Sequence, residues 1–191
     1  MLKFPESFPV LRKGNIILRK IKNADQIAIY QGLSDAQVIR YYGVEYHSYA
    51  DTGAQMHWYK DLWLTQTGIW WAITTEDIGD LIGACGFYNL QSAHRKAELG
   101  YWLMPHYWNQ GIMRLALEQI LTYGLEELNL HRLEAYVETE NQASAHLLQQ
   151  LGFRHEGTLQ DCEIKKQRFI SLDIFALLNP EEKLVSPATL G

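Results

Sequence analysis

One apolar stripe between residues 113 and 128 constrains the fold of this 191-residue chain more than any other feature. Its members recur at the spacing of one face of an α-helix: Met113, Leu117, Ile120, Leu121, Gly124 and Leu128. Segments typical of strands flank the stripe, at residues 97–103 before it and at residues 132–137 after it, where every second residue is apolar. The pattern therefore predicts a helix that connects two strands of one sheet.

The rest of the chain predicts further strands and helices around this unit. Strand patterns cover residues 16–19, 70–74, 81–88, 153–156 and 169–178. Helical patterns follow Asn23, follow Ser34-Asp35, surround residues 55–64, and run from an Asn141 cap to Gly152. This order favours an α/β (α+β) fold with a mixed sheet, and no linker divides it. We expect one domain over residues 1–179 and a tail over residues 180–191.

Composition excludes several classes of function. A net charge of −5 disfavours nucleic acid and anionic membrane as partners. Two cysteines form no disulfide framework, the first five residues lack a signal core, and no run approaches the ~18 apolar residues of a membrane span, so we expect a cytoplasmic protein. The seven histidines show no ligand spacing, so no metal is expected.

The segment from Tyr107 to Arg114 joins the strand at 97–103 to the long helix. A strand that turns tightly into a helix directs several unbonded N–H groups at one point, where the helix dipole also favours an anion. Gly111 would let a ligand approach the main chain, and Asn109 tolerates a positive φ. The residues alone predict either a main-chain cradle for a pyrophosphate or a capped core helix with a glycine near its start.

Four motifs, in sequence order, resemble the GNAT family of N-acetyltransferases. Trp108-Asn109-Gln110-Gly111-Ile112-Met113 is similar to its pyrophosphate loop, in the variant with a leading tryptophan found in ribosomal-protein alanine/serine N-acetyltransferases. The segment 98–103 resembles the family's fourth strand, residues 141–153 its N-x-x-S…G-F helix, and residues 157–163 the segment after it. The loop departs from the pattern at Asn109, where glycine is usual, and at Met113, where glycine or alanine is usual.

The resemblance implies a mixed, mostly antiparallel sheet of six to seven strands, splayed between strands four and five and flanked by about four helices. It implies acetyl-CoA as a co-substrate, with the pantetheine arm in the gap along the fourth strand and the pyrophosphate at the loop. The residues expected to bind it are Trp102, Leu103, Met104, Asn109, Gln110, Gly111, Ile112, Met113, Arg114, Asn141 and Ser144.

Acyl transfer to an amine requires a group that removes a proton, because amines with a pKa of ~8 to ~10.4 are protonated at pH 7. By resemblance, Glu163 is the first candidate for this general base and Ser144 the proton donor to the leaving thiolate. Glu98 is the alternative base, on a strand face that could point into the cleft. Each also has a structural alternative: an exposed strand glutamate, a first-turn serine, and a carboxylate paired with its neighbours Arg95 or Lys96.

Leu148 stands where another branch of the family has a catalytic tyrosine, so that acid is missing. The implied reaction is direct attack of the amine in a ternary complex. The acceptor is a protein N-terminus, as in the ribosomal-protein branch, or a small molecule such as a polyamine, an amino-acid derivative or an antibiotic. A non-catalytic module that binds acetyl-CoA is the alternative from another class. The resemblance also leaves room for a homodimer.

Overall fold

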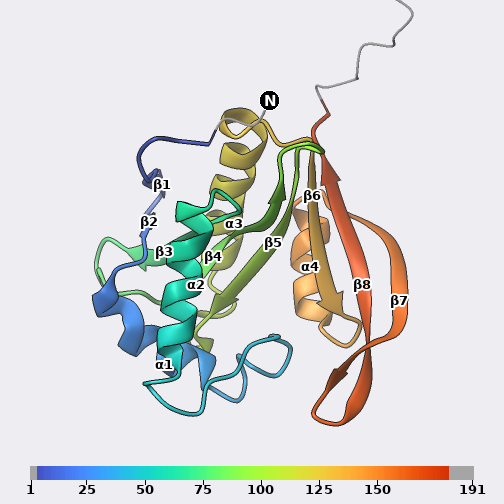
Figure 1. Ribbon diagram of the computed structural model, residues 1–191, viewed down its shortest axis with the longest axis horizontal. Coiled ribbons are helices and arrows are strands. Elements are labelled where there is room, and N and C mark those ends of the chain that lie inside the picture. The colour runs from blue at the N-terminus through green and yellow to red at the C-terminus, as the bar shows by residue number, and fades with distance from the viewer. Residues whose placement is uncertain (1–3, 181–191) are drawn as a thin grey trace, which may run out of the picture.

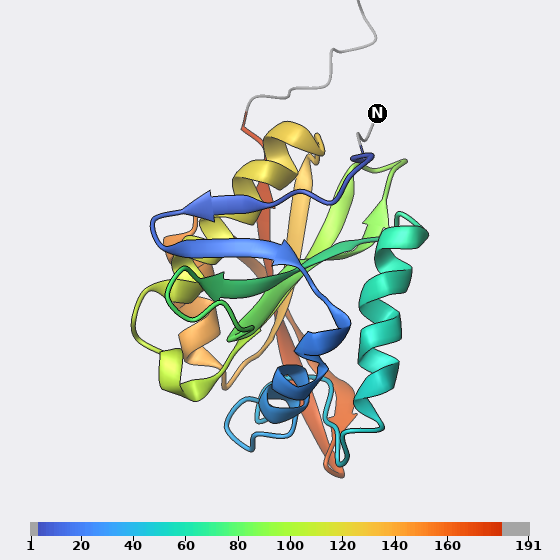
Figure 2. The same cartoon turned by 90° about the vertical axis from the view of Figure 1, so that its left-hand side faces the viewer.

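The computed structural model describes residues 4–180, which build one sheet covered by helices on both faces (Figures 1 and 2). Within these residues the sheet has eight strands in the order β1-β2-β3-β4-β5-β6-β8-β7, and every neighbouring pair is antiparallel except β5 and β6. The strands are β1 (Leu11–Lys13), β2 (Ile16–Lys20), β3 (Ile69–Thr75), β4 (Gly83–Gln91), β5 (Lys96–Leu103), β6 (Arg132–Glu138), β7 (Arg154–Lys165) and β8 (Arg168–Leu178). The mixed α/β fold is confirmed. The sheet exceeds the expected six to seven strands because the short β1 forms a hairpin with β2, with a turn at Gly14 where φ is 58°.

The helices separate into two layers. The four α-helices are α1 (Gln26–Leu33), α2 (Thr52–Leu64), α3 (Ile112–Thr122) and α4 (Gln142–Gln150). Two short 3₁₀ turns, η1 (Asn23–Asp25) and η2 (Pro105–Tyr107), precede α1 and α3. A π-helical turn at Tyr123–Glu127 follows α3. In Figure 2, α2 lies on one side of the sheet and α3 on the other.

Two sequence predictions in the N-terminal part were wrong. The segment after Ser34-Asp35 forms turns instead of a helix, because Asp35 Oδ1 accepts the N–H groups of Gln37 and Val38 and competes with helical bonding. Asn23 does not cap α1, because it begins η1 and α1 starts three residues later. The predicted tail lies, from residue 181 on, outside the described residues.

Each face of the sheet has its own core. Trp71 and Phe87 are fully buried in the cluster toward α3 and α4. Trp70 and Trp102 are buried in the cluster toward α1 and α2. Side chains alternate between the faces of a strand, so neighbours such as Tyr101 and Trp102 on β5 belong to opposite layers.

The sheet opens between β5 and β6. The parallel pairing joins only Lys96–Glu98 of β5 to Arg132–Glu134 of β6. Beyond this point β5 continues to Leu103 with pairing to β4 alone, and β6 continues to Glu138 with pairing to β8 alone. Figure 1 shows the two strands diverging, with α4 beside the gap. The expected splay is confirmed. It falls between β5 and β6 because β1 adds one strand to the count.

Gly32 in α1 touches the Trp102 ring, so its substitution tests how closely this layer packs. A Cβ atom on Gly32 would overlap that ring. We expect Gly32→Ala to lower the free energy of unfolding by about 1–3 kcal/mol, as overpacking of a core does. Gly53→Ala in α2 is the matched control, because a Cβ there meets nothing within 4 Å. Urea unfolding measures both variants, and equal stabilities would contradict the packing described.

Candidate functional site

The loop between η2 and α3 has the geometry of an anion cradle. Gly111 is the N-cap of α3 with φ of 75°, and Asn109 also has a positive φ, of 58°. No side chain of the described residues caps this end of α3, and a Cβ at Gly111 would meet nothing within 4 Å. First-turn N–H groups of a helix are strong donors to phosphate oxygens. The loop therefore fits a pyrophosphate bound by main-chain donors.

Trp108 ties the cradle to the end of β5. Its indole Nε1–H donates to the Leu103 carbonyl at 2.7 Å. The Met104 N–H donates to the Ile82 carbonyl at 3.0 Å and is therefore used within the molecule. Because main-chain groups alternate in direction along a strand, Leu103 directs its N–H and C=O to the open side of β5, whereas Trp102 and Met104 face β4. Among the three predicted strand residues, Leu103 is the one with main-chain groups in the gap.

Three side chains of the loop region bond or pack elsewhere, so the main chain forms the cradle. Met113 packs against the core, so its bulk does not fill the loop. Gln110 Nε2 donates to the His106 carbonyl at 2.8 Å. Arg114 Nε forms an ion pair with Glu118 at 3.0 Å, one helical turn further on. The structure therefore gives Arg114 a partner within its own helix, while Asn109 and Gly111 supply the turn.

On the α3/α4 face, the first turn of α4 approaches β5. Asn141 Oδ1 accepts the Ser144 N–H at 3.2 Å, which confirms Asn141 as the N-cap of α4. Ser144 Oγ lies 2.6 Å from the hydroxyl of Tyr101, on the part of β5 that has left β6. Burial raises the pKa of Tyr101 to about 12, against the opposing effect of the Ser144 hydrogen bond. Leu148, one turn below, is fully buried in the core.

On the α1/α2 face, the two candidate bases come together. Burial raises the pKa of the Tyr88 hydroxyl well above its usual range, and the further contributions are the charge of Glu98, its hydrogen bond, the charge of Tyr136 and, last, the charge of Glu163. Glu98 also accepts Asn89 Nδ2 at 2.5 Å. The charges of two carboxylates that are far apart in sequence therefore act on the same tyrosine hydroxyl.

The neighbouring carboxylates are paired, and these two are not. Lys96 Nζ lies 3.4 Å from Glu134 Oε2, and Lys165 Nζ lies 2.5 Å from Glu138 Oε1. Among residues 4–180, neither Glu98 nor Glu163 forms an ion pair. Of the structural alternative for Glu98, a pairing with Arg95 or Lys96, the Lys96 pairing is not formed, because Lys96 binds the β6 carboxylate Glu134 beside it. Two negative charges on this face thus remain available to a cation.

Aromatic side chains cover the same face. Trp58 packs against Trp70 and Tyr88 with ring centroids 5.4 and 6.1 Å apart. Tyr59 lies beside Trp70 and accepts the Trp102 indole N–H at 3.3 Å. Trp63 of α2 packs instead against Phe8, with ring centroids 5.0 Å apart. Sequence reasoning missed Tyr88 and Tyr101, because alternating strand residues reveal which face they share but not which partners meet them there.

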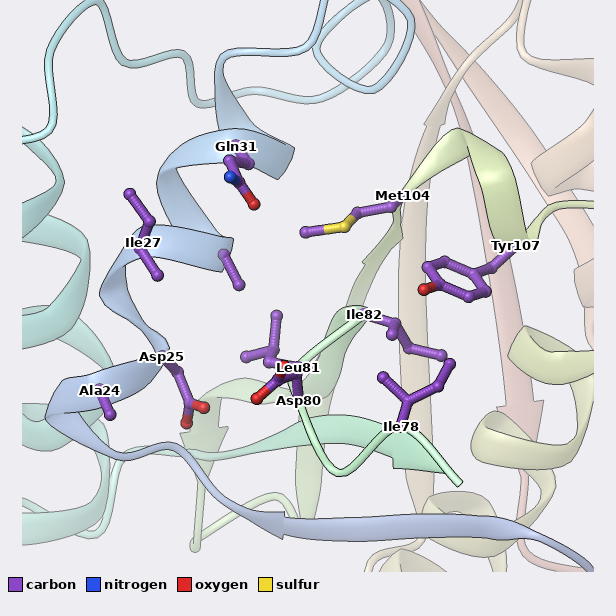
Figure 3. Close-up of a pocket in the computed structure, with 11 residues that line it drawn as sticks. Ala24, Asp25, Ile27, Gln31, Ile78, Asp80, Leu81, Ile82, Met104 and Tyr107 are labelled. Atoms are coloured by element: carbon purple, nitrogen blue, oxygen red, sulfur yellow. The ribbon is translucent and has the colours of Figure 1, made fainter. Parts of the chain in front are cut away.

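A cavity of about 280 Å³ opens next to the end of β5 (Figure 3). Ile27 and Gln31 of α1, the loop through Asp80, and Met104 and Tyr107 surround it (Figure 3). None of the predicted catalytic residues lines it. Met104 lines the cavity and directly follows Leu103, so the cavity adjoins the candidate site.

Of the two cysteines, Cys162 is exposed on β7 beside Glu163, and Cys85 lies in the core. Cys85 is fully buried, and burial strongly raises the pKa of its thiol, so it cannot act as a nucleophile. No group of three His, Cys, Asp or Glu residues gathers at metal-binding distance in residues 4–180. None of the helices in that range is long and apolar enough to cross a membrane.

Comparisons with known proteins agree with this geometry. The sequence model of the acetyltransferase (GNAT) domain matches residues 15–154. An uncharacterised N-acetyltransferase of Bacillus subtilis, YoaA, is 34% identical over 92% of this chain and 99% of its own length. The spermidine N(1)-acetyltransferase of Escherichia coli K12 is 32% identical over 42% of this chain and 44% of its own. Among solved structures, a ribosomal alpha-N-protein acetyltransferase in complex with coenzyme A superposes with a TM-score of 0.81 at 19% identity, covering 89% of this chain and 98% of that one.

Proposed function

From the premise that this chain belongs to the GNAT acetyltransferases and is an acetyl-CoA-dependent N-acetyltransferase, we propose that its acceptor is a primary amine with a second positive charge nearby, of the di- or polyamine class. The observation that carries this proposal is the pair Glu98 and Glu163, two carboxylates that form no ion pair within residues 4–180 and whose charges both raise the pKa of the Tyr88 hydroxyl. The spermidine acetyltransferase among the relatives supports it. The domain that performs the reaction runs over residues 1–179.

In this proposal each residue has one task. The main chain of residues 109–114 holds the pyrophosphate, and Leu103 holds the pantetheine arm of acetyl-CoA, which supplies the acetyl group as a thioester. Glu163 takes the proton of the attacking amine, and Glu98 binds the second ammonium group. Glu98 suits binding better than proton transfer, because Asn89 and Tyr88 already donate to it.

A matched pair of amines tests the acceptor class. Putrescine and 1-aminobutane have the same chain length and differ in the second charge. We expect kcat/KM to be roughly fivefold higher for putrescine, the size of one partly exposed charge pair, and Glu98→Gln to remove this difference. The measurement is release of coenzyme A at saturating acetyl-CoA. Equal rates for both amines in the parent protein would contradict the proposal.

A protein N-terminus is the second candidate. Ile164 and Phe169 face each other across β7 and β8 with exposed fractions of 71% and 66%, an apolar pair that a peptide or a second copy of the chain could cover. Peptides that begin with serine or alanine therefore belong in the same assay. Faster turnover of such a peptide than of putrescine would support this candidate, and sedimentation of the protein would test the homodimer.

A further inference from the structure

The hydrogen bond between Tyr101 and Ser144 joins the two sides of the splay. Tyr101 extends from β5 after that strand has left β6, and Ser144 lies in the first turn of α4. The two hydroxyl oxygens are 2.6 Å apart. Both residues belong to regular elements, and the Asn141 cap fixes the main chain of Ser144. The contact therefore holds the Ser144 hydroxyl in one orientation beside the gap.

Either hydroxyl can donate in this bond. We assign Tyr101 as the donor and Ser144 Oγ as the acceptor, because a phenol is a much stronger acid than a serine hydroxyl. A hydroxyl that accepts a hydrogen bond is a better donor for its own hydrogen, because the bonds polarise one another. The Ser144 hydrogen is then free to point elsewhere, at the N-terminus of a helix whose dipole favours a negative charge.

We propose that Tyr101 is a positioning residue, which donates to Ser144 Oγ and thereby directs the Ser144 hydroxyl hydrogen at the sulfur of coenzyme A. The inference rests on the coenzyme lying in the gap between β5 and β6 and not on the identity of the acceptor amine. Position 148 of α4 is a buried leucine and offers no phenol to this site. Tyr101 supplies a phenol from β5 instead. The high pKa of Tyr101 keeps it protonated, as a donor must be.

The balance of the reaction requires no further reactant. The amine nitrogen forms a bond to the acetyl carbon while the bond from that carbon to sulfur breaks. Glu163 takes the proton that makes the ammonium group a free amine and passes it to water, and then takes the second proton that the nitrogen loses when the amide forms, while the electron pair of the broken bond remains on sulfur. The Ser144 hydroxyl stabilises this thiolate by a hydrogen bond, and the thiolate takes its proton from water after it leaves. Tyr101 and Ser144 keep their own protons throughout.

The test measures the thiol of bound coenzyme A and does not depend on turnover. Thiolate absorbance near 232 nm is followed against pH with saturating coenzyme A, and a parallel titration with desulfo-coenzyme A, which lacks the thiol, is subtracted. In the parent protein we expect the thiol pKa to lie below that of free coenzyme A. Tyr101→Phe is expected to raise it by about 0.5 to 1, the effect of one neutral hydrogen bond. Ser144→Ala is expected to raise it at least as much.

Two control comparisons make the outcome decisive. Tyr101→Phe in the Ser144→Ala background should change nothing further, because the tyrosine acts through the serine. Tyr123→Phe, which removes a hydroxyl from a ring packed against Trp71, should leave the thiol pKa unchanged. A thiol pKa in Tyr101→Phe equal to that of the parent, with tight coenzyme binding, would overturn the inference. Failure of the parent to bind coenzyme A would instead overturn its placement in the gap.

Discussion

Gly111→Glu is expected to weaken acetyl-CoA binding about 100-fold, which corresponds to about 2.7 kcal/mol. The backbone at Gly111 has a φ of 75°, and the first-turn N–H groups of α3 lack a capping side chain in the described part of the chain. A glutamate there would place its carboxylate where those N–H groups converge, occupy the cradle and repel a pyrophosphate. Isothermal titration of acetyl-CoA measures the change directly.

Gly14→Glu is the matched control for this variant. Gly14 also has a positive φ, of 58°, and open space around its Cβ position, but it lies in the turn between β1 and β2. Both variants carry the same new charge and the same kind of backbone strain, which costs about 1–2 kcal/mol of folding stability. Binding lost in Gly111→Glu and retained in Gly14→Glu would locate the coenzyme at the cradle. Unchanged binding in both variants would exclude the loop as its site.

Glu163→Gln is expected to lower kcat/KM for the amine at neutral pH by about 100-fold, the lower range for loss of a general base. The substitution keeps the size of the side chain and removes its ability to take a proton. The Kd for acetyl-CoA should stay unchanged, because Glu163 belongs to β7, whereas the main chain between η2 and α3 forms the cradle. Initial rates over a range of amine concentrations separate kcat from KM.

Two further variants separate the roles of the carboxylates. Glu98→Gln should mainly raise KM for a diamine, because its proposed task is binding. Glu126→Gln, an exposed glutamate of the π-helical turn after α3, should behave as the parent protein. Loss of kcat in Glu98→Gln together with near-normal kcat in Glu163→Gln would mean that Glu98 is the base and Glu163 the binding residue.

The parts of the site that the sequence predicted correctly depend on short-range geometry. The positive φ at Asn109, the turn at Gly111 and the Asn141 cap each involve groups a few residues apart, so local residue preferences specify them. The apolar stripe specified α3 in the same way, because a helix repeats its face every few residues. The splay was predicted by resemblance, and the register of β5 and β6 confirms it.

The interpretations that the structure did not bear out have one local cause and one long-range cause. Asp35 has the composition of a helix start, but its side chain bonds the local main chain and forms a turn instead. Lys96 neighbours Glu98 closely in sequence, yet the parallel pairing brings it to Glu134 on β6. Long-range pairing outweighs sequence proximity in each strand of the site.

The sequence by itself determined the turn at Asn109 and Gly111, the Asn141 cap of α4 and the mixed sheet, because each follows from local backbone preference or from the period of apolar residues. Only the tertiary structure decided that the charges of Glu98 and Glu163 act on Tyr88 and that Tyr101 meets Ser144. The position of Glu163 depends on an irregularity in the pairing of β7 and β8, where Asp161 adopts a φ of 49°. No glycine marks that point in the sequence, and a shift of one residue would turn the carboxylate to the opposite face.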